Sequence, residues 1–147
     1  MITKINIRGY RKFKDFTLKP GKKLNLIVGS NEAGKSTLLE AVALALTGRL
    51  NGRAAAEELN PYWFNTTLVA EYVRSRLDGG RPSLPEILIE LFLEDTPELQ
   101  SLCGAVNSEL PTHACPGVSF RVRPNPDYAV EVAEWEKSPT HLLPVVF

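Results

Sequence analysis

The sequence predicts an α/β fold in which a strand, a glycine-rich loop and a helix are combined with antiparallel strands. An apolar run at residues 24–28 enters a loop that begins at Gly29, and a segment with apolar residues at helical spacing leaves it. Beyond residue 84, apolar residues alternate with polar ones, the pattern of half-buried strands. The composition, 44% hydrophobic and 23% charged over 147 residues, is that of a globular chain and excludes a disordered or fibrous one.

Three strands are expected before and into the loop. In residues 2–8, Ile5 and Ile7 share one face between polar neighbours, and residues 13–18 repeat that pattern less regularly. The nearly all-apolar run 24–28 is expected to be a buried central strand.

Two helices are expected after the loop. The first covers residues 38–46 and is ended by Gly48, and its apolar stripe consists of Leu38, Leu39, Val42 and Leu46. Residues 49–64 are expected to be loop. Asn65 is then suited to cap a second helix that runs to Leu77.

The remainder of the chain is expected to be mainly strands. Residues 86–94 place four aliphatic side chains on one face, which predicts a strand. Residues 95–116 are expected to hold a short helix and loops. Residues 118–123 and 128–132 alternate and are predicted to pair as a hairpin around the turn at 124–127.

The loop matches the phosphate-binding pattern G-x-x-x-x-G-K-[ST], the P-loop or Walker A motif. Glycine lets the backbone approach a phosphate closely, and N–H groups at a helix start attract anions. Lys35 is expected between the β- and γ-phosphates, Ser36 on Mg²⁺, and Thr37 near the α-phosphate. The motif therefore predicts ATP and Mg²⁺ as cofactors, Ser36 as the metal ligand, and these nucleotide-contacting residues: Gly29, Ser30, Asn31, Glu32, Ala33, Gly34, Lys35, Ser36 and Thr37.

The formal net charge of zero hides a split along the chain. Residues 1–50 hold ten basic and three acidic residues, a net +7, and residues 51–147 hold seven basic and fourteen acidic ones, a net −7. A basic half is compatible with a polyanionic partner and equally with a solvated edge. The chain has no run of 18 apolar residues and no secretory signal pattern, and two cysteines make no disulfide scaffold, so we expect a cytoplasmic protein.

The sequence GYRKFKDF at 9–16, followed by VGSNEAGKSTLLEA at 28–41, resembles the start of SMC/RecF-like ABC ATPases, and most of all the OLD (overcoming lysogenization defect) family of ATP-dependent endonucleases. The stretches 60–65, 85–91 and 116–118 also look like the N-terminal part of such proteins, so the resemblance covers nearly the whole chain. It implies an ABC/SMC-type P-loop lobe, an ATPase that dimerises around two nucleotides, and often a following TOPRIM nuclease domain that cuts DNA in repair or phage defence.

The same resemblance implies roles for three residues. Asn31 would contact the terminal phosphates, and Arg11 and Lys12 would face the nucleotide. For Arg11 and Lys12, ordinary surface charge accounts for the sequence equally well.

The parts needed for hydrolysis are not found in the sequence. An ABC ATPase needs an apolar strand that ends in Asp-Glu, and Glu94-Asp95 has the reverse order. No Leu-Ser-Gly-Gly-like signature and no acidic metal cluster is present. We therefore expect residues 1–147 to be the N-terminal part of a larger ATPase domain, with no second domain and no complete catalytic set. Its expected parts are a hairpin, P-loop and helix (1–48), a loop and helix (49–84), and an antiparallel lobe (85–147).

Such a chain would bind ATP without turning it over, with ATPase and endonuclease activity belonging to the full-length protein. The alternative is a nucleotide-switched binding or assembly module without catalysis. A kinase-type phosphotransferase is disfavoured by the hairpin that precedes the loop.

Three weaker patterns remain. Cys103, His113 and Cys115 supply three zinc ligands where a closed site needs four, so free thiols are the better account. The aromatic trio Tyr62-Trp63-Phe64 is compatible with stacking on a base or partner, and more often such a cluster is core. Basic residues of the first hairpin are compatible with contacts to double-stranded DNA or with a solvated edge: Lys4, Arg8, Lys14, Lys19, Lys22 and Lys23.

Overall fold

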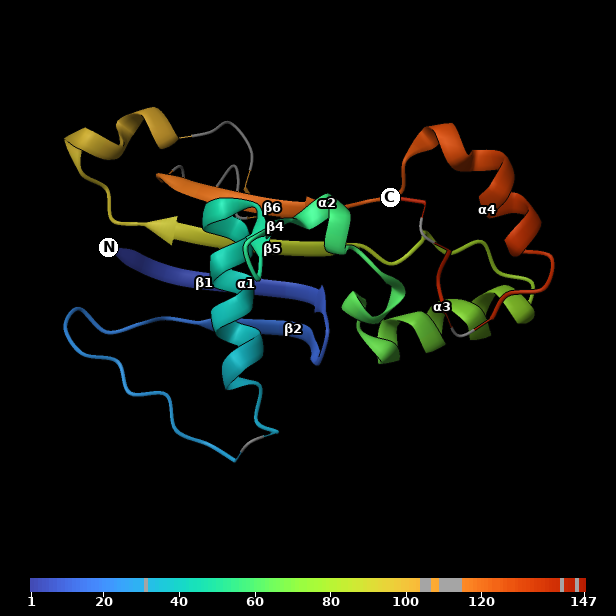
Figure 1. Cartoon of the computed structure of the whole chain (residues 1–147), viewed down its shortest axis with the longest axis horizontal. Coiled ribbons are helices and arrows are strands. Elements are labelled where there is room, and N and C mark those ends of the chain that lie inside the picture. Colours follow the sequence, from blue (N-terminus) through green and yellow to red (C-terminus); the bar gives the residue numbers. More distant parts are fainter. Residues whose placement is uncertain (31, 104–106, 109–114, 141, 145) are drawn as a thin grey trace.

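A four-stranded antiparallel sheet forms the main layer of the molecule (Figure 1). The computed structural model of the protein defines residues 1–147 except 31, 104–106, 109–114, 141 and 145. The strand order is β2-β1-β5-β6, so the first hairpin and the later strands build one continuous sheet. These strands are β1 (Ile2–Tyr10), β2 (Phe13–Leu18), β5 (Ile87–Leu93) and β6 (Gly117–Val122). The expectation of an α/β fold with antiparallel strands is confirmed.

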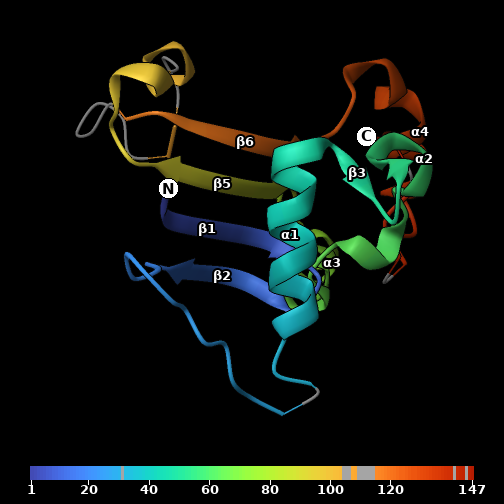
Figure 2. The ribbon, with the colours of Figure 1, turned by 60° about the vertical axis from the view of Figure 1, so that its left-hand side comes forward.

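Helix α1 (Lys35–Thr47) lies across one face of this sheet, as Figure 2 makes plain. The register places Ile7 opposite Phe16 on β2 and Ile89 on β5. Ile7 and Ile89 are fully buried, and α1 adds Leu38, Ala41 and Leu44 to the same core. Gly48 ends α1 in a left-handed conformation, and its N–H donates to the Leu44 carbonyl at 2.8 Å, as the sequence predicted.

The prediction that residues 49–64 are loop is wrong. They form the hairpin β3 (Arg49–Leu50) and β4 (Arg53–Ala54), the short helix α2 (Ala55–Glu58) and the 3-10 turn η1 (Pro61–Trp63). Asn51 and Gly52 at the hairpin turn both have positive φ, at 51° and 83°. An Asn-Gly pair with both φ positive is the favoured two-residue hairpin turn, because its twist matches that of the strands.

Helix α3 (Thr66–Leu77) begins where the sequence predicted, because the Asn65 Oδ1 accepts the Leu68 N–H at 3.2 Å. The predicted strand at 128–132 is wrong. The 3-10 turn η3 (Pro126–Tyr128) leads there into helix α4 (Ala129–Trp135), so among the described strands β6 pairs with β5 alone. Proline at the start of a helical turn, with the Asn125 side chain capping it, nucleates this helix.

The predicted short helix within 95–116 is the 3-10 helix η2 (Pro97–Leu102). Helix α4 packs on α3: the Tyr72 and Trp135 rings stack with centroids 6.0 Å apart, and Arg76 pairs with Glu136 at 2.8 Å. Among the described helices, none has the length and apolarity needed to cross a bilayer.

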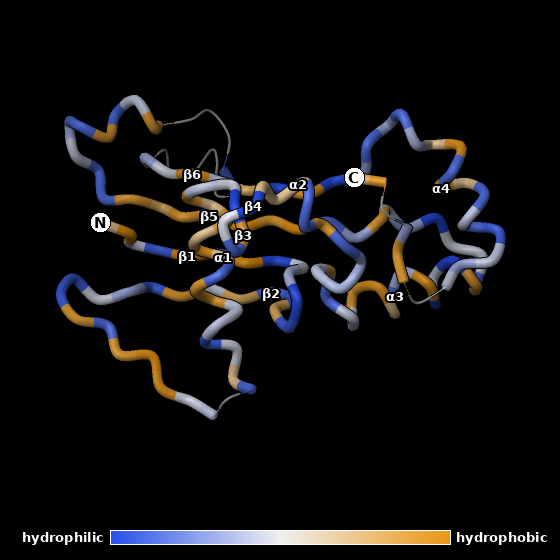
Figure 3. The backbone as a smooth tube through the Cα atoms, viewed as in Figure 1, coloured by the Kyte–Doolittle hydropathy of each residue, from blue (hydrophilic) through white to orange (hydrophobic). Residues whose placement is uncertain are grey.

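The prediction that residues 24–28 form a buried central strand is wrong in this structure. The segment is extended but pairs with no described strand, and Leu24, Leu26 and Val28 are 89%, 83% and 79% exposed. Figure 3 shows this apolar stretch running well outside the sheet. A strand requires a neighbour for its backbone hydrogen bonds, and β2, at the nearer sheet edge, pairs with β1 and with no other described strand.

The predicted apolar stripe of α1 needs the same correction. Leu38 is buried, whereas Leu39 and Leu46 are 64% and 55% exposed. An open cavity of about 400 Å³ separates Leu39 and Val42 of α1 from Leu26 and Ile27. The two apolar surfaces therefore face one groove without closing it.

Candidate functional site

The glycine-rich loop leads directly into the first turn of α1. The Ala33 N–H donates to the Ser30 carbonyl at 3.0 Å and tightens the loop. The Lys35 ammonium donates to the carbonyls of Gly29 and Ser30, the latter at 2.8 Å. Its positive charge is therefore held over the loop backbone. Asn31 lies outside the described residues.

Gly34 is the position at which the loop admits only glycine. Its φ is 93°, and an added Cβ would lie 2.8 Å from Lys12 Cδ and 3.0 Å from Phe13 Cζ. At Gly29 an added Cβ would lie 2.8 Å from the Ala33 Cβ. Two glycines therefore keep the loop compact against the β1–β2 turn, with space that a side chain would otherwise fill.

The first turn of α1 presents the groups that attract an anion. A helix leaves its first N–H groups without intrahelical acceptors, and the aligned peptide dipoles add positive potential there. No acidic residue lies in this turn, and the side chains of Ser36 and Thr37 are exposed and half-buried. Glu32 and Ala33, in the preceding loop, are exposed. The donor set is that of a phosphate site, with a hydroxyl on Ser36 suited to a hard cation such as Mg²⁺.

The β1–β2 turn brings Lys12 to the loop and Arg11 to helix α1. Arg11 forms an ion pair with Glu40 of α1 at 2.7 Å, and Lys12 contacts Gly34. Arg11 has a φ of 47°, rare for a residue with a side chain. Its backbone is held there because its N–H donates to the Trp63 carbonyl at 2.6 Å and its carbonyl accepts from Asn65 Nδ2 at 2.7 Å.

Sequence reasoning missed Glu40, Tyr10 and the second role of Asn65. The Tyr10 hydroxyl donates to Glu40 at 3.5 Å, and burial raises the pKa of Tyr10 to about 12, with the nearby Arg11 opposing and Glu40 reinforcing that shift. Asn65 both caps α3 and holds the Arg11 carbonyl. No spacing rule links residues 11, 40 and 65, because they meet only through the tertiary fold.

Glu94-Asp95 lies at the other end of the sheet from the loop. The Glu94 N–H donates to the Met1 carbonyl at 2.8 Å, whereas Lys12 contacts Gly34. The nine residues of β1 lie between these points, about 30 Å at about 3.3 Å per residue. These two acids are therefore too far from the loop to act on a group bound there.

The three aromatic residues 62–64 differ in their exposure to solvent. Trp63 and Phe64 are core, 2% and 3% exposed, whereas Tyr62 is 75% exposed. Cys103 is exposed and Cys115 buried, and burial raises the pKa of the Cys115 thiol. His113 lies outside the described residues, and no group of three metal-ligating side chains is found among the described ones.

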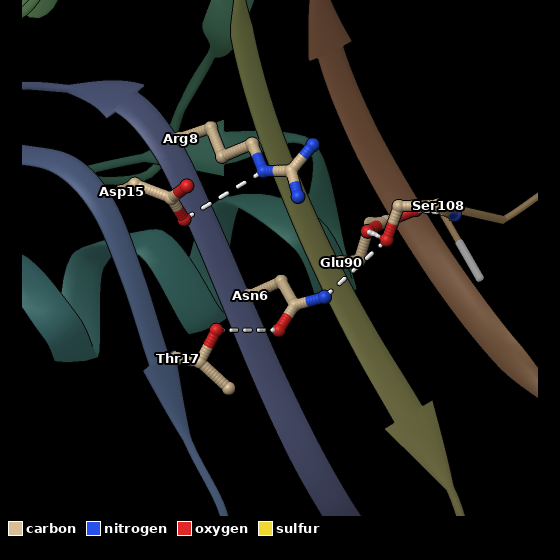
Figure 4. Close-up of polar contacts among 6 residues, drawn as sticks. All are labelled: Asn6, Arg8, Asp15, Thr17, Glu90 and Ser108. Atoms are coloured by element: carbon tan, nitrogen blue, oxygen red, sulfur yellow. Dashed lines mark hydrogen bonds and ion pairs between the residues drawn. The ribbon is translucent and has the colours of Figure 1, made fainter.

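A second polar cluster lies on the sheet face opposite α1 (Figure 4). The Glu90 carboxylate, 3% exposed, accepts hydrogen bonds from the Ser108 backbone N–H at 2.8 Å and from its hydroxyl. Asn6 donates to the Ser108 hydroxyl at 3.3 Å and accepts from Thr17 at 3.1 Å. These bonds satisfy the buried carboxylate and attach Ser108 to the sheet, so the cluster is structural.

Residues 4–92 match the model of a protein family described as an AAA domain. Three curated relatives are similar over parts of the chain. The DNA replication and repair protein RecF of Magnetococcus marinus is 42% identical over 67 residues, which is 44% of this chain and 18% of the relative. The RecF protein of Xanthomonas axonopodis pv. citri is 32% identical over 114 residues, 71% of this chain and 31% of the relative.

The third relative is the structural maintenance of chromosomes protein 5 of Arabidopsis thaliana, 37% identical over 81 residues, which is 54% of this chain and 7% of the relative. The chain thus spans less than a third of the length of each of these relatives. A solved structure described as "Structural biochemistry of ATP-driven dimerization and DNA stimulated activation of SMC ATPases" has a TM-score of 0.45 and 18% identity, and the match covers 86% of this chain and 64% of that one.

Proposed function

The chain belongs to the AAA domain family and is an SMC/RecF-like ABC ATPase, and from this premise we propose that it is the ATP- and Mg²⁺-binding N-terminal part of a DNA-processing ATPase of the OLD nuclease type. Hydrolysis and DNA cleavage require further parts of the full-length protein. The residues proposed to bind the nucleotide are those of the loop and helix start, 29–37, with Arg11 and Lys12.

One observation carries this proposal: the Lys35 ammonium lies over the loop, bonded to the carbonyls of Gly29 and Ser30, at the N-terminus of a 13-residue helix. A cation tethered only to carbonyls is free to exchange them for phosphate oxygens, which form stronger, charge-assisted bonds. Bound Mg²⁺ would bridge the β- and γ-phosphates, with Ser36 as its protein ligand.

Arg11 and Lys12 support the same assignment through their position. Their turn is fixed to the segment 63–65 by backbone and side-chain hydrogen bonds, so the backbone that carries both cations is in place before any ligand arrives. A preformed turn lowers the cost of binding, because the turn itself does not have to be ordered. The nucleotide is thus a polyanionic ligand that accounts for the net charge of +7 in residues 1–50.

The proposal of binding without turnover rests on the acids. Glu94 and Asp95 lie a full strand length from the loop, and Glu40, the acid next to it, is paired with Arg11. An attacking water needs a carboxylate that polarises it beside the terminal phosphate. Apart from Glu32, which belongs to the loop itself, no described acid is found beside the loop with an unpaired carboxylate.

DNA, dimerisation and the cytoplasm belong to the proposal at the level of the whole protein. Two of the relatives are named for DNA replication and repair, which supports double-stranded DNA as the polymer acted on. The family resemblance of residues 9–16 and 28–41 supports a homodimer built around the nucleotides in the cytoplasm. A role in DNA repair or phage defence follows from the same resemblance.

A calorimetric titration of the 147-residue chain with Mg-ATP tests the nucleotide site. We expect saturable binding that Lys35→Ala weakens by about tenfold or more, because a charge-assisted contact to phosphate is worth about 1.5–3 kcal/mol. Lys23→Ala, which removes the same charge from the exposed segment before the loop, should leave the affinity unchanged. Equal affinities for Lys35→Ala and wild type would refute the site. Release of phosphate by this chain would refute the claim that turnover needs further parts.

A further inference from the structure

We propose that Tyr62 is the stacking platform for the base of the nucleotide, an inference that rests on the proposed function of the loop and adds a base subsite to it. Tyr62 follows Pro61 in the turn η1, and the residue is 75% exposed while the next two aromatic residues are core. No ring contact of Tyr62 is found among the described residues, so its face is free for a flat apolar ligand.

Tyr62 lines an open cavity of about 550 Å³. The same cavity is lined by Arg11 and Lys12 of the β1–β2 turn and by Asn60. Cationic groups therefore line one part of its wall and an aromatic ring another. A nucleotide has the complementary composition, with an anionic phosphate chain joined through a sugar to an aromatic base.

Lys12 connects this cavity to the phosphate loop. Its side chain lines the cavity and also lies against Gly34, where an added Cβ would come within 2.8 Å of Lys12 Cδ. A ligand whose phosphates are held at Lys35 and whose sugar passes Lys12 would therefore reach the space in front of Tyr62. Lys12 therefore borders both the cavity and the last residue of the loop before α1.

The walls of the cavity are held in place before any ligand binds. Arg11 is fixed to Trp63 and Asn65 by backbone and side-chain hydrogen bonds of 2.6 and 2.7 Å. The Tyr62 N–H donates to Asn60 Oδ1 at 3.0 Å, and Asn60 Nδ2 donates to the Glu58 carbonyl at 2.9 Å. Preformed walls of this kind are typical of small-molecule sites.

The hydrogen bonds of Asn60 indicate how far the subsite can distinguish one base from another. The Asn60 amide, one of the groups in the cavity able to distinguish base edges, is held by one hydrogen bond at its oxygen and one at its nitrogen, which limit its turning toward a base. Stacking on tyrosine depends on the face of the base and tolerates every base. We therefore infer a purine-accepting subsite that binds ATP and GTP with similar affinity, purines offering the larger face.

Calorimetry with three probes separates the base subsite from the phosphate site: Mg-ATP, Mg-GTP and inorganic tripolyphosphate with Mg²⁺. For the wild type we expect both nucleotides to bind about five- to tenfold more tightly than tripolyphosphate, the lower part of the range for one stacked base. Tyr62→Ala should remove that advantage and leave tripolyphosphate binding unchanged. Tyr62→Phe should retain it, and Tyr128→Ala, at a partly exposed tyrosine of η3, is the matched control.

The two proposals fail in distinguishable ways. If Lys35→Ala weakens all three probes but Tyr62→Ala binds ATP as well as the wild type, the base subsite is refuted and the phosphate site stands. If Lys35→Ala binds all three like the wild type, the phosphate site is refuted. Proton NMR on the unmutated chain is a second readout, because ATP, and not tripolyphosphate, should shift the Tyr62 ring resonances; equal shifts with both would also refute stacking.

Discussion

Arg11 and Glu40 form an ion pair, 2.7 Å between guanidinium and carboxylate, that joins the β1–β2 turn to helix α1. Both side chains are about one third exposed. The pair therefore contributes little to stability, about 1 kcal/mol or less, as exposed pairs generally do. Its larger effect is on the site, because Glu40 competes with an anionic ligand for the Arg11 guanidinium.

Glu40→Gln should raise the affinity for Mg-ATP several-fold. The substitution removes a negative charge beside a polyanion site and releases Arg11 toward the ligand. The gain should shrink with added salt, because partly exposed charges are screened. Calorimetric titrations at two ionic strengths measure it. Glu134→Gln, which removes an acid of α4 that is also paired with a cation, should leave the affinity for Mg-ATP unchanged. An unchanged affinity for Glu40→Gln would exclude Arg11 from the site.

Gly34→Ala should destabilise the fold more than Gly48→Ala. Both glycines have positive φ, 93° and 63°, so both substitutions incur backbone strain of about 1 kcal/mol. At Gly48 an added Cβ meets nothing within 4 Å, whereas at Gly34 it meets Lys12 and Phe13. We expect losses of about 1 kcal/mol at Gly48 and about 2–3 kcal/mol at Gly34 in denaturant unfolding. Equal losses would mean that the turn moves away without cost.

Asn65→Ala should cost about 2–3 kcal/mol of unfolding free energy. The substitution removes the N-cap of α3, worth about 1 kcal/mol, and leaves the Arg11 carbonyl without its donor. Asn125→Ala is the matched control, because Asn125 caps only the short turn η3. If chemical denaturation gives both variants the same loss of unfolding free energy, the hydrogen bond from Asn65 to the Arg11 carbonyl contributes nothing to stability.

The free energy of unfolding should fall at alkaline pH because the Tyr10 hydroxyl is buried. Burial raises its pKa to about 12 in the fold, from 10.0 in an unfolded chain. Below pH 10 the hydroxyl is protonated in both states, and its contribution is fully present. Between pH 10 and 12 only the unfolded chain releases the proton, so stability falls, by up to about 2 kcal/mol for this group. Tyr10→Phe should show a correspondingly smaller fall in unfolding titrations at pH 9 and pH 11, and an identical fall would assign the effect elsewhere.

Much of the fold followed from local rules. Strand β2 and the start of α3 lie where alternation and the Asn65 cap predicted them, because both signals act within a few residues. The helix at 129–135 was missed because Val130 and Val132 fit a strand as well as a helix, and Pro126 decided between them. The Asn51-Gly52 turn was overlooked although its signal was present.

The site divides in the same way. The loop 29–37 is a contiguous motif, so its recognition needed no tertiary structure. The partners that hold its surroundings, Glu40 and Asn65, come from distant positions that no spacing rule connects. Burial of residues 24–28 was predicted from their apolar side chains alone. A strand also needs neighbouring strands for its backbone hydrogen bonds, and the sequence of 24–28 does not determine whether such neighbours are available.

The exposed run Leu-Asn-Leu-Ile-Val at 24–28 has a practical consequence for work on this polypeptide. Its backbone pairs with no strand in the described part of the chain, and with its aliphatic side chains it forms the kind of edge along which chains add to one another. Lys22 and Lys23, immediately before it, place two like charges beside that edge and oppose such stacking. We therefore expect self-association that grows with protein concentration and with salt, and dilute, low-salt buffers should keep the chains apart.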